Sequence, residues 1–164
     1  MATSGYRVLP IEGLKPSNRR AVVFLTKPDD KNLDAKAVFD NLDNKQKRTL
    51  LTRFDHWIEG AEGATPHDKY FHGWPNDKDY KSCFVFKWKH KNGHHRLYGF
   101  LFNPQPNTRP NFRVCVLASH AIKSTWETDP SELKGAKALH DSLPVVAALK
   151  ALFPDKKVKE NDRR

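Results

Sequence analysis

The chain has 164 residues, 29 Lys and Arg against 19 Asp and Glu, and a formal net charge of +10. With 38% hydrophobic residues it suits one globular domain, and no apolar run resembles a signal peptide or a membrane span. Two cysteines, Cys83 and Cys115, are too few for a disulfide framework or a cysteine zinc site, and both lie in apolar strand-like runs. We expect them to be buried free thiols.

The elements expected in chain order follow from hydrophobic periodicity and turn residues. They are a flexible arm over residues 1–20, a strand over 21–26, helices over 33–42 and 50–58, a loop over 61–80, strands over 84–90, 96–102 and 112–118, helices from 129 and over 144–153, and a charged tail over 154–164. Asp43 fits the N-cap of the second helix and Gly60 fits its end. Residues 21–153 therefore make up one expected domain.

A hairpin is expected where Asn92-Gly93, a favoured two-residue turn, separates two alternating strands. With that turn, Lys91 pairs with His94, Lys89 with Arg96, and Lys87 with Tyr98. Side chains alternate along a strand, so these six are expected together on one cationic face. The opposite face then carries the core residues Phe84, Phe86, Trp88, Leu97 and Gly99.

The following helix has a clear predicted start. Asp129 fits the N-cap, Pro130 fits the first helical position, and Glu132 completes a capping box. The order of strand, two helices, three strands and further helices predicts an α+β fold, with a small antiparallel sheet and an N-terminal helical pair.

Positive charge is concentrated in residues 81–126, which contain no Asp or Glu but eight Lys and Arg and four His. This segment therefore holds +8 of the net charge of +10. A solvated surface normally mixes both signs, because like charges repel in the compact state. The concentration indicates a polyanionic partner, RNA or DNA first of all. A merely soluble basic face is the alternative.

A face of Lys, Arg, His and Tyr suits RNA cleavage, because RNA carries its own nucleophile in the 2′-hydroxyl. Cleavage then needs a base, cations for the phosphate and an acid for the leaving oxygen, and His120 is the favoured acid or base. Two-metal hydrolysis needs several carboxylates, so neither metal nor cofactor is expected. His90, His94 and His95 lie close together, but the alternation points His94 away from the other two, which argues against zinc. Spacing alone does not separate a catalytic face from a binding face.

Three segments of the chain resemble the RelE/HigB group of toxins from type II toxin–antitoxin systems. They are Arg96–Phe100, the apolar strand Val114–Lys123, and Thr128–Ala136 with its Asp-Pro turn and Glu-Leu helix start. The resemblance extends over roughly 21–139. It implies a RelE-like, microbial-ribonuclease-like fold and a cytoplasmic mRNA endonuclease that acts at the ribosome, needs no cofactor and is neutralised by an antitoxin protein.

The resemblance also assigns roles by position. Lys87 and Lys89 match basic residues on the strand before the phosphate-binding arginine, which is Arg96 here. His120 and Lys123 match the polar end of the last strand. The expected catalytic residues are thus Lys87, Lys89, Arg96, His120 and Lys123, and the expected RNA-binding residues are Lys91, His94, Tyr98 and Arg113.

Two other functional hypotheses fit the same residues. One is a basic nucleic-acid-binding or regulatory protein without catalysis. The other is an interaction module for an acidic protein partner, which predicts little salt-sensitive RNA binding, whereas both nucleic-acid hypotheses predict a steep loss of affinity with salt.

Overall fold

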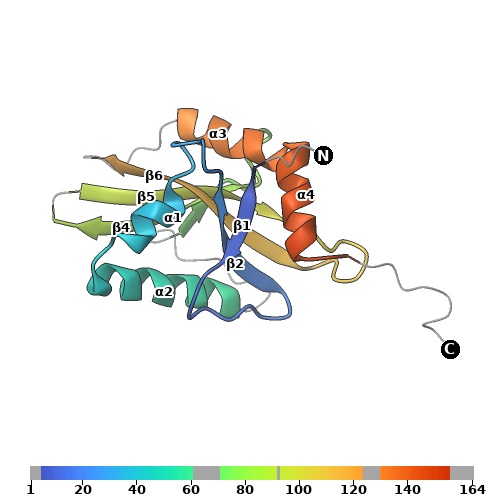
Figure 1. Ribbon diagram of the computed structural model, residues 1–164, viewed down its shortest axis with the longest axis horizontal. Helices are drawn as coiled ribbons and strands as arrows, with labels where there is room; N and C mark the ends of the chain where they lie inside the picture. Colours follow the sequence, from blue (N-terminus) through green and yellow to red (C-terminus); the bar gives the residue numbers. More distant parts are fainter. Residues whose placement is uncertain (1–4, 61–70, 92, 124–129, 156–164) are drawn as a thin grey trace.

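The computed structural model describes residues 5–60, 71–91, 93–123 and 130–155 (Figure 1). The elements in chain order are β1 (Arg7–Pro10), β2 (Arg20–Thr26), α1 (Ala35–Asp40), α2 (Asn44–Glu59), β3 (Phe71–Gly73), β4 (Cys83–His90), β5 (Gly93–Phe102), β6 (Arg113–Lys123), α3 (Pro130–His140) and α4 (Leu143–Leu152). None of the helices in these ranges is both long enough and apolar enough to span a membrane.

The sheet has six strands in the order β1-β2-β6-β5-β4-β3. Adjacent strands in the sheet run antiparallel, except for β2 and β6, which run parallel. The class α+β is right, but the expected small antiparallel sheet with an N-terminal helical pair is wrong. The sheet is larger because β1 forms inside the predicted arm and β3 inside the predicted 61–80 loop, and both pair with neighbouring strands. It is mixed because β2 pairs in parallel with β6. Two strands also precede the helices α1 and α2.

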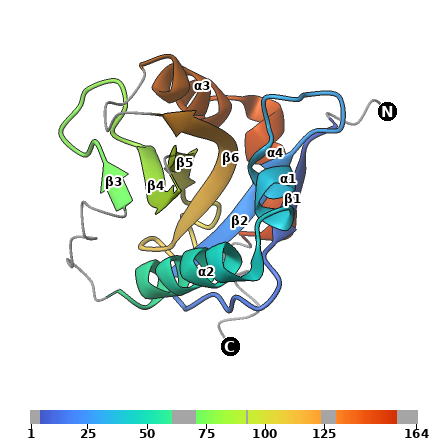
Figure 2. The ribbon, with the colours of Figure 1, turned by 90° about the vertical axis from the view of Figure 1, so that its left-hand side faces the viewer.

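Helices cover both faces of the sheet. Figure 1 shows α3 above and α2 below it, and Figure 2 shows the sheet from its end between the two helical layers. On the α1/α2 face, Phe54 packs against Phe86 at a ring separation of 4.9 Å. On the α3/α4 face, Val145 and Leu149 of α4 pack beneath β2 and β6, and Leu133 of α3 packs against Tyr98. The domain therefore has two hydrophobic layers separated by the sheet.

The β4–β5 hairpin keeps the predicted faces but not the predicted register. His90 pairs with Gly93, and Lys91 has a positive φ of 55°, so the turn lies one residue earlier than expected. Asn92 itself lies outside the described residues. Cross-strand partners shift by two residues, which leaves every side chain on its original face. Phe84, Phe86, Trp88 and Leu97 accordingly lie in the α1/α2 core, as predicted.

The ends of α2 are fixed as the sequence predicts. Asp43 Oδ1 accepts a hydrogen bond from the Gln46 amide at 2.8 Å, and Gly60 is the C-cap. The Arg20 guanidinium also donates to the carbonyl of Trp57 at 2.6 Å, which satisfies a group of the last turn. The predicted N-cap of α3, Asp129, lies outside the described residues.

Both cysteines are buried free thiols, as predicted. Burial raises the pKa of Cys83 to about 11 and raises that of Cys115 well above its ordinary value. Neither thiol is therefore ionised at neutral pH, and both act as small apolar core groups.

A β-bulge interrupts the pairing of β5 with β6. Gly99 pairs with Leu117, whereas Tyr98 pairs with Ser119, so Ala118 is an extra residue on β6. A Cβ atom on Gly99 would lie 1.8 Å from the carbonyl oxygen of Val116. The close approach of the two backbones at this point thus requires glycine.

We expect Gly99→Ala to lower the free energy of unfolding by about 3 kcal/mol or more, because the methyl group overlaps backbone that the bulge holds in place. Urea denaturation followed by circular dichroism measures this change. Gly135→Ala in α3 is the matched control, since nothing lies within 4 Å of its Cβ position. It should raise stability by about 0.5–1 kcal/mol. Equal effects of the two substitutions would contradict the bulge geometry.

Candidate active site

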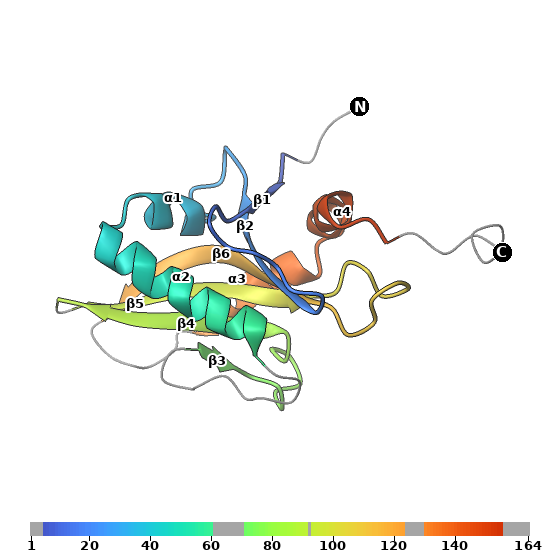
Figure 3. The same cartoon turned by 90° about the horizontal axis from the view of Figure 1, so that it is seen from below.

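Three strands extend beyond the rest of the sheet at one end. The β2–β6 pairing ends at Phe24 and Leu117, and the β3–β4 pairing ends at Phe71 and Phe86. We call the remaining part the distal sheet: residues 87–90 of β4, 93–98 of β5 and 119–123 of β6. Figures 1 and 3 show it as the end where β4, β5 and β6 project past β2 and β3. Most of the predicted site residues lie here.

A pair of histidines occupies the α1/α2 face of the distal sheet. His95 Nδ1 and His120 Nε2 lie 3.0 Å apart and share a hydrogen bond. The indole ring of Trp88 stacks on His95 with a centroid separation of 4.9 Å and an angle of 22°. The ring of His90 lies 6.4 Å from that of His95. Three strands thus each contribute imidazole or indole to one cluster.

Hydrogen bonds from two other elements hold this cluster in place. Trp88 Nε1 donates to Gln46 Oε1 of α2 at 3.0 Å, which fixes the indole plane on which His95 stacks. The His120 backbone amide donates to Asp34 Oδ1, just before α1, at 2.8 Å. The Arg53 guanidinium donates to the Lys87 carbonyl at 2.6 Å and ties α2 to β4. The histidine rings are therefore positioned by packed, partly buried supports.

Burial lowers the pKa of both histidines. For His95, desolvation is the main cause and the nearby His90 adds to it. For His120, desolvation and then His95 lower the pKa, while the Asp34 carboxylate opposes them. Both rings are therefore neutral at physiological pH, the form in which an imidazole can act as a base.

A neutral, hydrogen-bonded histidine pair offers a base and an acid together. One ring nitrogen in the shared bond carries the proton and the other accepts it. Of the two outer nitrogens, one then has a free lone pair and the other carries a proton, whichever tautomer is present. Proton uptake at one outer nitrogen, transfer across the shared bond and release at the other returns the pair to a neutral state.

Gly93 lies close beside this pair. A Cβ atom on Gly93 would lie 3.4 Å from His95 Nε2 and 3.0 Å from Ile122 Cγ2. Ile122 is itself 60% exposed on the same face. A side chain at position 93 would therefore crowd the outer nitrogen of His95.

The opposite face of the distal sheet carries a row of basic residues. Lys89 pairs with His94, and His94 pairs with Lys123, so the three lie side by side across β4, β5 and β6. Lys89 and Lys123 thus flank His94, and an anionic ligand on this face would lie between two cationic side chains. Lys91 lies at the exposed turn next to this row.

Two of the predicted contact residues are not on an open surface. Arg96 and Tyr98 are 0% exposed, and the guanidinium of Arg96 donates to the Tyr98 hydroxyl at 3.3 Å. The expected open cationic face is therefore wrong at these positions, because α3 packs over this part of the sheet. Lys87 pairs with Arg96 and lies on the same face, partly exposed.

Arg113 lies far from the other predicted site residues, at the first position of β6. Its guanidinium donates to the carbonyls of Phe112 and Pro110 at 2.9 and 3.4 Å. The structure thus places Lys89, His94 and Lys123 on one face of the distal sheet, with Lys91 at the adjoining turn, and His120 on the other face, and it separates Arg113 from all of them.

Sequence reasoning did not select His95, Trp88 or Asp34 for the site. Alternation already placed His95 on the face of Trp88, and that was a usable signal. His120 reaches the same face only through the bulge at Ala118, which no local pattern reveals. Asp34 contributes through a bond to a residue 86 positions later in the chain.

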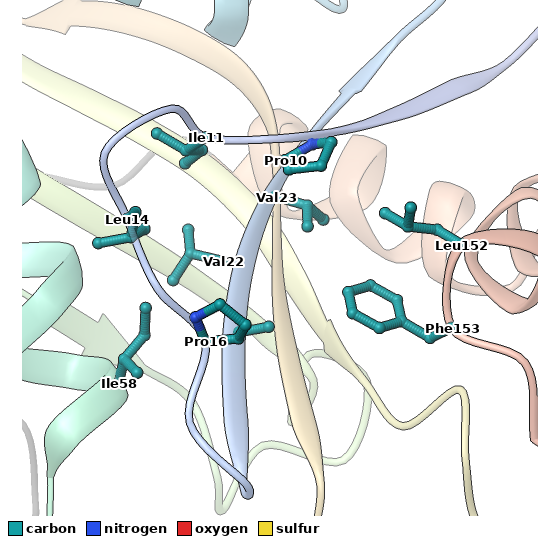
Figure 4. A pocket seen from close by; sticks show the side chains of 10 residues that line it. Pro10, Ile11, Leu14, Pro16, Val22, Val23, Ile58, Leu152 and Phe153 are labelled. Carbon is teal, nitrogen blue, oxygen red and sulfur yellow. The ribbon is translucent and has the colours of Figure 1, made fainter.

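Two hollows border the domain, and they differ in chemistry. One, of about 420 Å³, lies beside His120 and is lined by both carboxylates and apolar groups. The other, of about 150 Å³, is lined by apolar side chains from the β1–β2 connection, α2 and the end of α4 (Figure 4). Figure 4 shows Val22, Ile58 and Phe153 around it, with no titratable side chain among the labelled residues. Of these two hollows, the first adjoins the histidine pair.

Within the described ranges, no group of three or more His, Cys, Asp or Glu side chains could hold a metal ion.

The chain matches no protein-family model, no curated protein and no solved structure. Function must therefore be argued from the site itself.

We expect the histidine pair to make the protein less stable in mild acid. Because their pKa values are lower in the folded state, the unfolded chain binds protons more readily once the pH falls below about 6.5. The free energy of unfolding should therefore decrease between pH 7.5 and 5.5, and His95→Gln should flatten that decrease. Denaturant titrations at both pH values measure the free energy of unfolding. His56→Gln, at an exposed position of α2, is the control. If the free energy of unfolding of His95→Gln fell between pH 7.5 and 5.5 by as much as that of the wild type, the lowered pKa of His95 would be contradicted.

Proposed function

We propose that this protein is a metal-independent RNA endonuclease whose acid–base group is the His95–His120 pair. The observation that carries the proposal is the 3.0 Å hydrogen bond between two partly buried imidazoles with lowered pKa values. Perturbed titratable groups that are positioned together are typical of catalytic sites. The basic residues of the distal sheet supply the complementary affinity for phosphate.

The proposed reaction uses the RNA's own 2′-hydroxyl. One outer nitrogen of the pair takes the 2′-hydroxyl proton while the 2′-oxygen forms a bond to phosphorus. The bond from phosphorus to the 5′-oxygen breaks, and the other outer nitrogen gives its proton to that oxygen, directly or through a water molecule. The products are a 2′,3′-cyclic phosphate and a 5′-hydroxyl, and no electrons are exchanged with a cofactor.

The row of Lys89, His94 and Lys123 would bind the phosphates that flank the cleaved bond. These residues lie on the opposite face from the histidine pair, separated only by the thickness of one sheet. An RNA strand that passes around the open edge of β6 would reach both faces. Lys123 lies next to Ile122 and His120 along that edge, which supports such a path.

The biological setting is proposed from the resemblance to RelE/HigB toxins. It suggests mRNA as the substrate, cleavage at the ribosome, an antitoxin protein as the inhibitor and a cytoplasmic location. The non-catalytic alternative has one observation in its favour: Arg96, the arginine that the resemblance assigns to phosphate binding, is fully buried. In that case the distal sheet binds nucleic acid and the histidine pair stabilises the fold.

Cleavage assays on a short RNA test the enzyme hypothesis. We expect His95→Ala and His120→Ala each to lower the cleavage rate by about 10²-fold or more, because general acid–base catalysis contributes about 10²–10⁴-fold. Chelating agents should have no effect, and the product should end in a 2′,3′-cyclic phosphate. His56→Ala, exposed at the far end of α2, is the matched control. RNA binding without cleavage by the wild type would favour the non-catalytic alternative.

Salt dependence tests the cationic row separately from catalysis. Lys89→Ala and Lys123→Ala should each weaken RNA binding and reduce the slope of log affinity against log salt by about 1. Lys150→Ala, at an exposed position of α4, should leave the slope of log affinity against log salt unchanged. Fluorescence anisotropy with a 2′-deoxy oligonucleotide measures binding without cleavage. Equal slopes in all three variants would show that phosphate binds elsewhere.

A further inference from the structure

The hollow beside His120 lies at the open edge of β6, where β2 no longer pairs with it. One wall is the segment Asp30–Asp34 that precedes α1, and the other is the face of α3 that runs from Ser131 to Leu139. Its volume of about 420 Å³ is within the range of about 300–1,000 Å³ that small-molecule sites occupy. His120 is thus shared between this groove and the histidine pair.

The groove combines an apolar surface with carboxylates. Leu33, Ala136 and Leu139 line it with aliphatic groups, and Asp34 and Glu132 line it with acidic groups. Each of these two carboxylates uses one oxygen within the protein: Asp34 Oδ1 accepts from the His120 amide at 2.8 Å, and Glu132 Oε2 accepts from the Ser119 hydroxyl at 3.4 Å. These bonds fix the carboxylates and leave each with a second acceptor oxygen. A flat apolar ring with N–H donors on its edge fits this lining.

The charges around the groove would orient a bound nucleotide. Three carboxylates in the lining, Asp30, Asp34 and Glu132, outnumber its one cation, Lys31, and repel a phosphate, whereas Lys89 and Lys123 of the distal sheet attract one. A nucleotide placed at His120 would therefore turn its base into the groove and its phosphates toward the basic row. This arrangement puts the ribose next to the histidine pair.

We propose that the groove binds a guanine base of the RNA, through the carboxylate of Glu132 and the apolar wall of α3; this inference rests on the proposed function. A carboxylate presents two neighbouring acceptors, and guanine alone presents two neighbouring donors, N1–H and N2–H, on its pairing edge. Adenine and cytosine place a ring acceptor beside their amino group, which would face a carboxylate oxygen. Uracil has one N–H between two carbonyls.

Four RNA hexamers that differ in one base test the proposal, each with an uncleavable all-2′-deoxy counterpart. We expect the wild type to cleave next to guanine about tenfold faster than next to uracil, since a good bidentate contact discriminates by about 5- to 150-fold. Glu132→Gln should reduce that preference to less than about threefold, because the amide replaces one acceptor with a donor. Glu12→Gln, exposed on the β1–β2 connection, is the control and should behave as the wild type.

The design distinguishes failure of this inference from failure of the proposed function. Cleavage of all four hexamers at equal rates, or a guanine preference unchanged in Glu132→Gln, would overturn the groove assignment and leave the nuclease intact. Absence of cleavage would overturn the nuclease, while anisotropy with the deoxy hexamers still reports base preference. Gly135→Leu, which fills the groove from α3 without altering its charges, is a second variant and should lower guanine preference as well.

Discussion

The bulge between β5 and β6 is the constraint on which the candidate site depends. An extra residue in a strand reverses the faces of all residues beyond it. Without Ala118 as the extra residue, His120 would lie opposite Arg96 beneath α3; with it, His120 pairs with Leu97 and meets His95. The missing side chain at Gly99 permits the bulge, because Val116 approaches there too closely for any other residue. One glycine therefore places the second histidine of the pair.

The distal sheet carries three different groups of side chains, one on each face and one at the edge of β6. The α1/α2 face holds two neutral imidazoles against Trp88, where low solvation suits proton transfer. The α3/α4 face presents Lys89, His94 and Lys123 in one row, the surface proposed to bind phosphate. The edge of β6 opens onto a groove lined by carboxylates, which is proposed to bind the base rather than the phosphate. Under the proposed function, these separations would hold a base and its phosphate in different places.

Local rules predicted local features well. The N-cap at Asp43, the buried thiols and the core face of Phe84, Phe86 and Trp88 follow from capping and alternation. The hairpin register was off by two residues because such a slip leaves the hydrophobic face unchanged, so the pattern could not detect it. The burial of Arg96 and the meeting of His95 with His120 depend on which distant elements pack together. Alternation along one strand carries no information about that.

The proposed mechanism depends on His95 and His120 being neutral at physiological pH and joined by one hydrogen bond whose proton lies between His95 Nδ1 and His120 Nε2. Nitrogen-15 NMR of the histidine side chains across a pH titration tests it most directly. We expect a coupling across the shared bond between His95 Nδ1 and His120 Nε2, pKa values below the ordinary histidine value, and a changed titration of either ring when the other is replaced. Two independent titrations near pH 6.5, with no coupling between the rings, would contradict it.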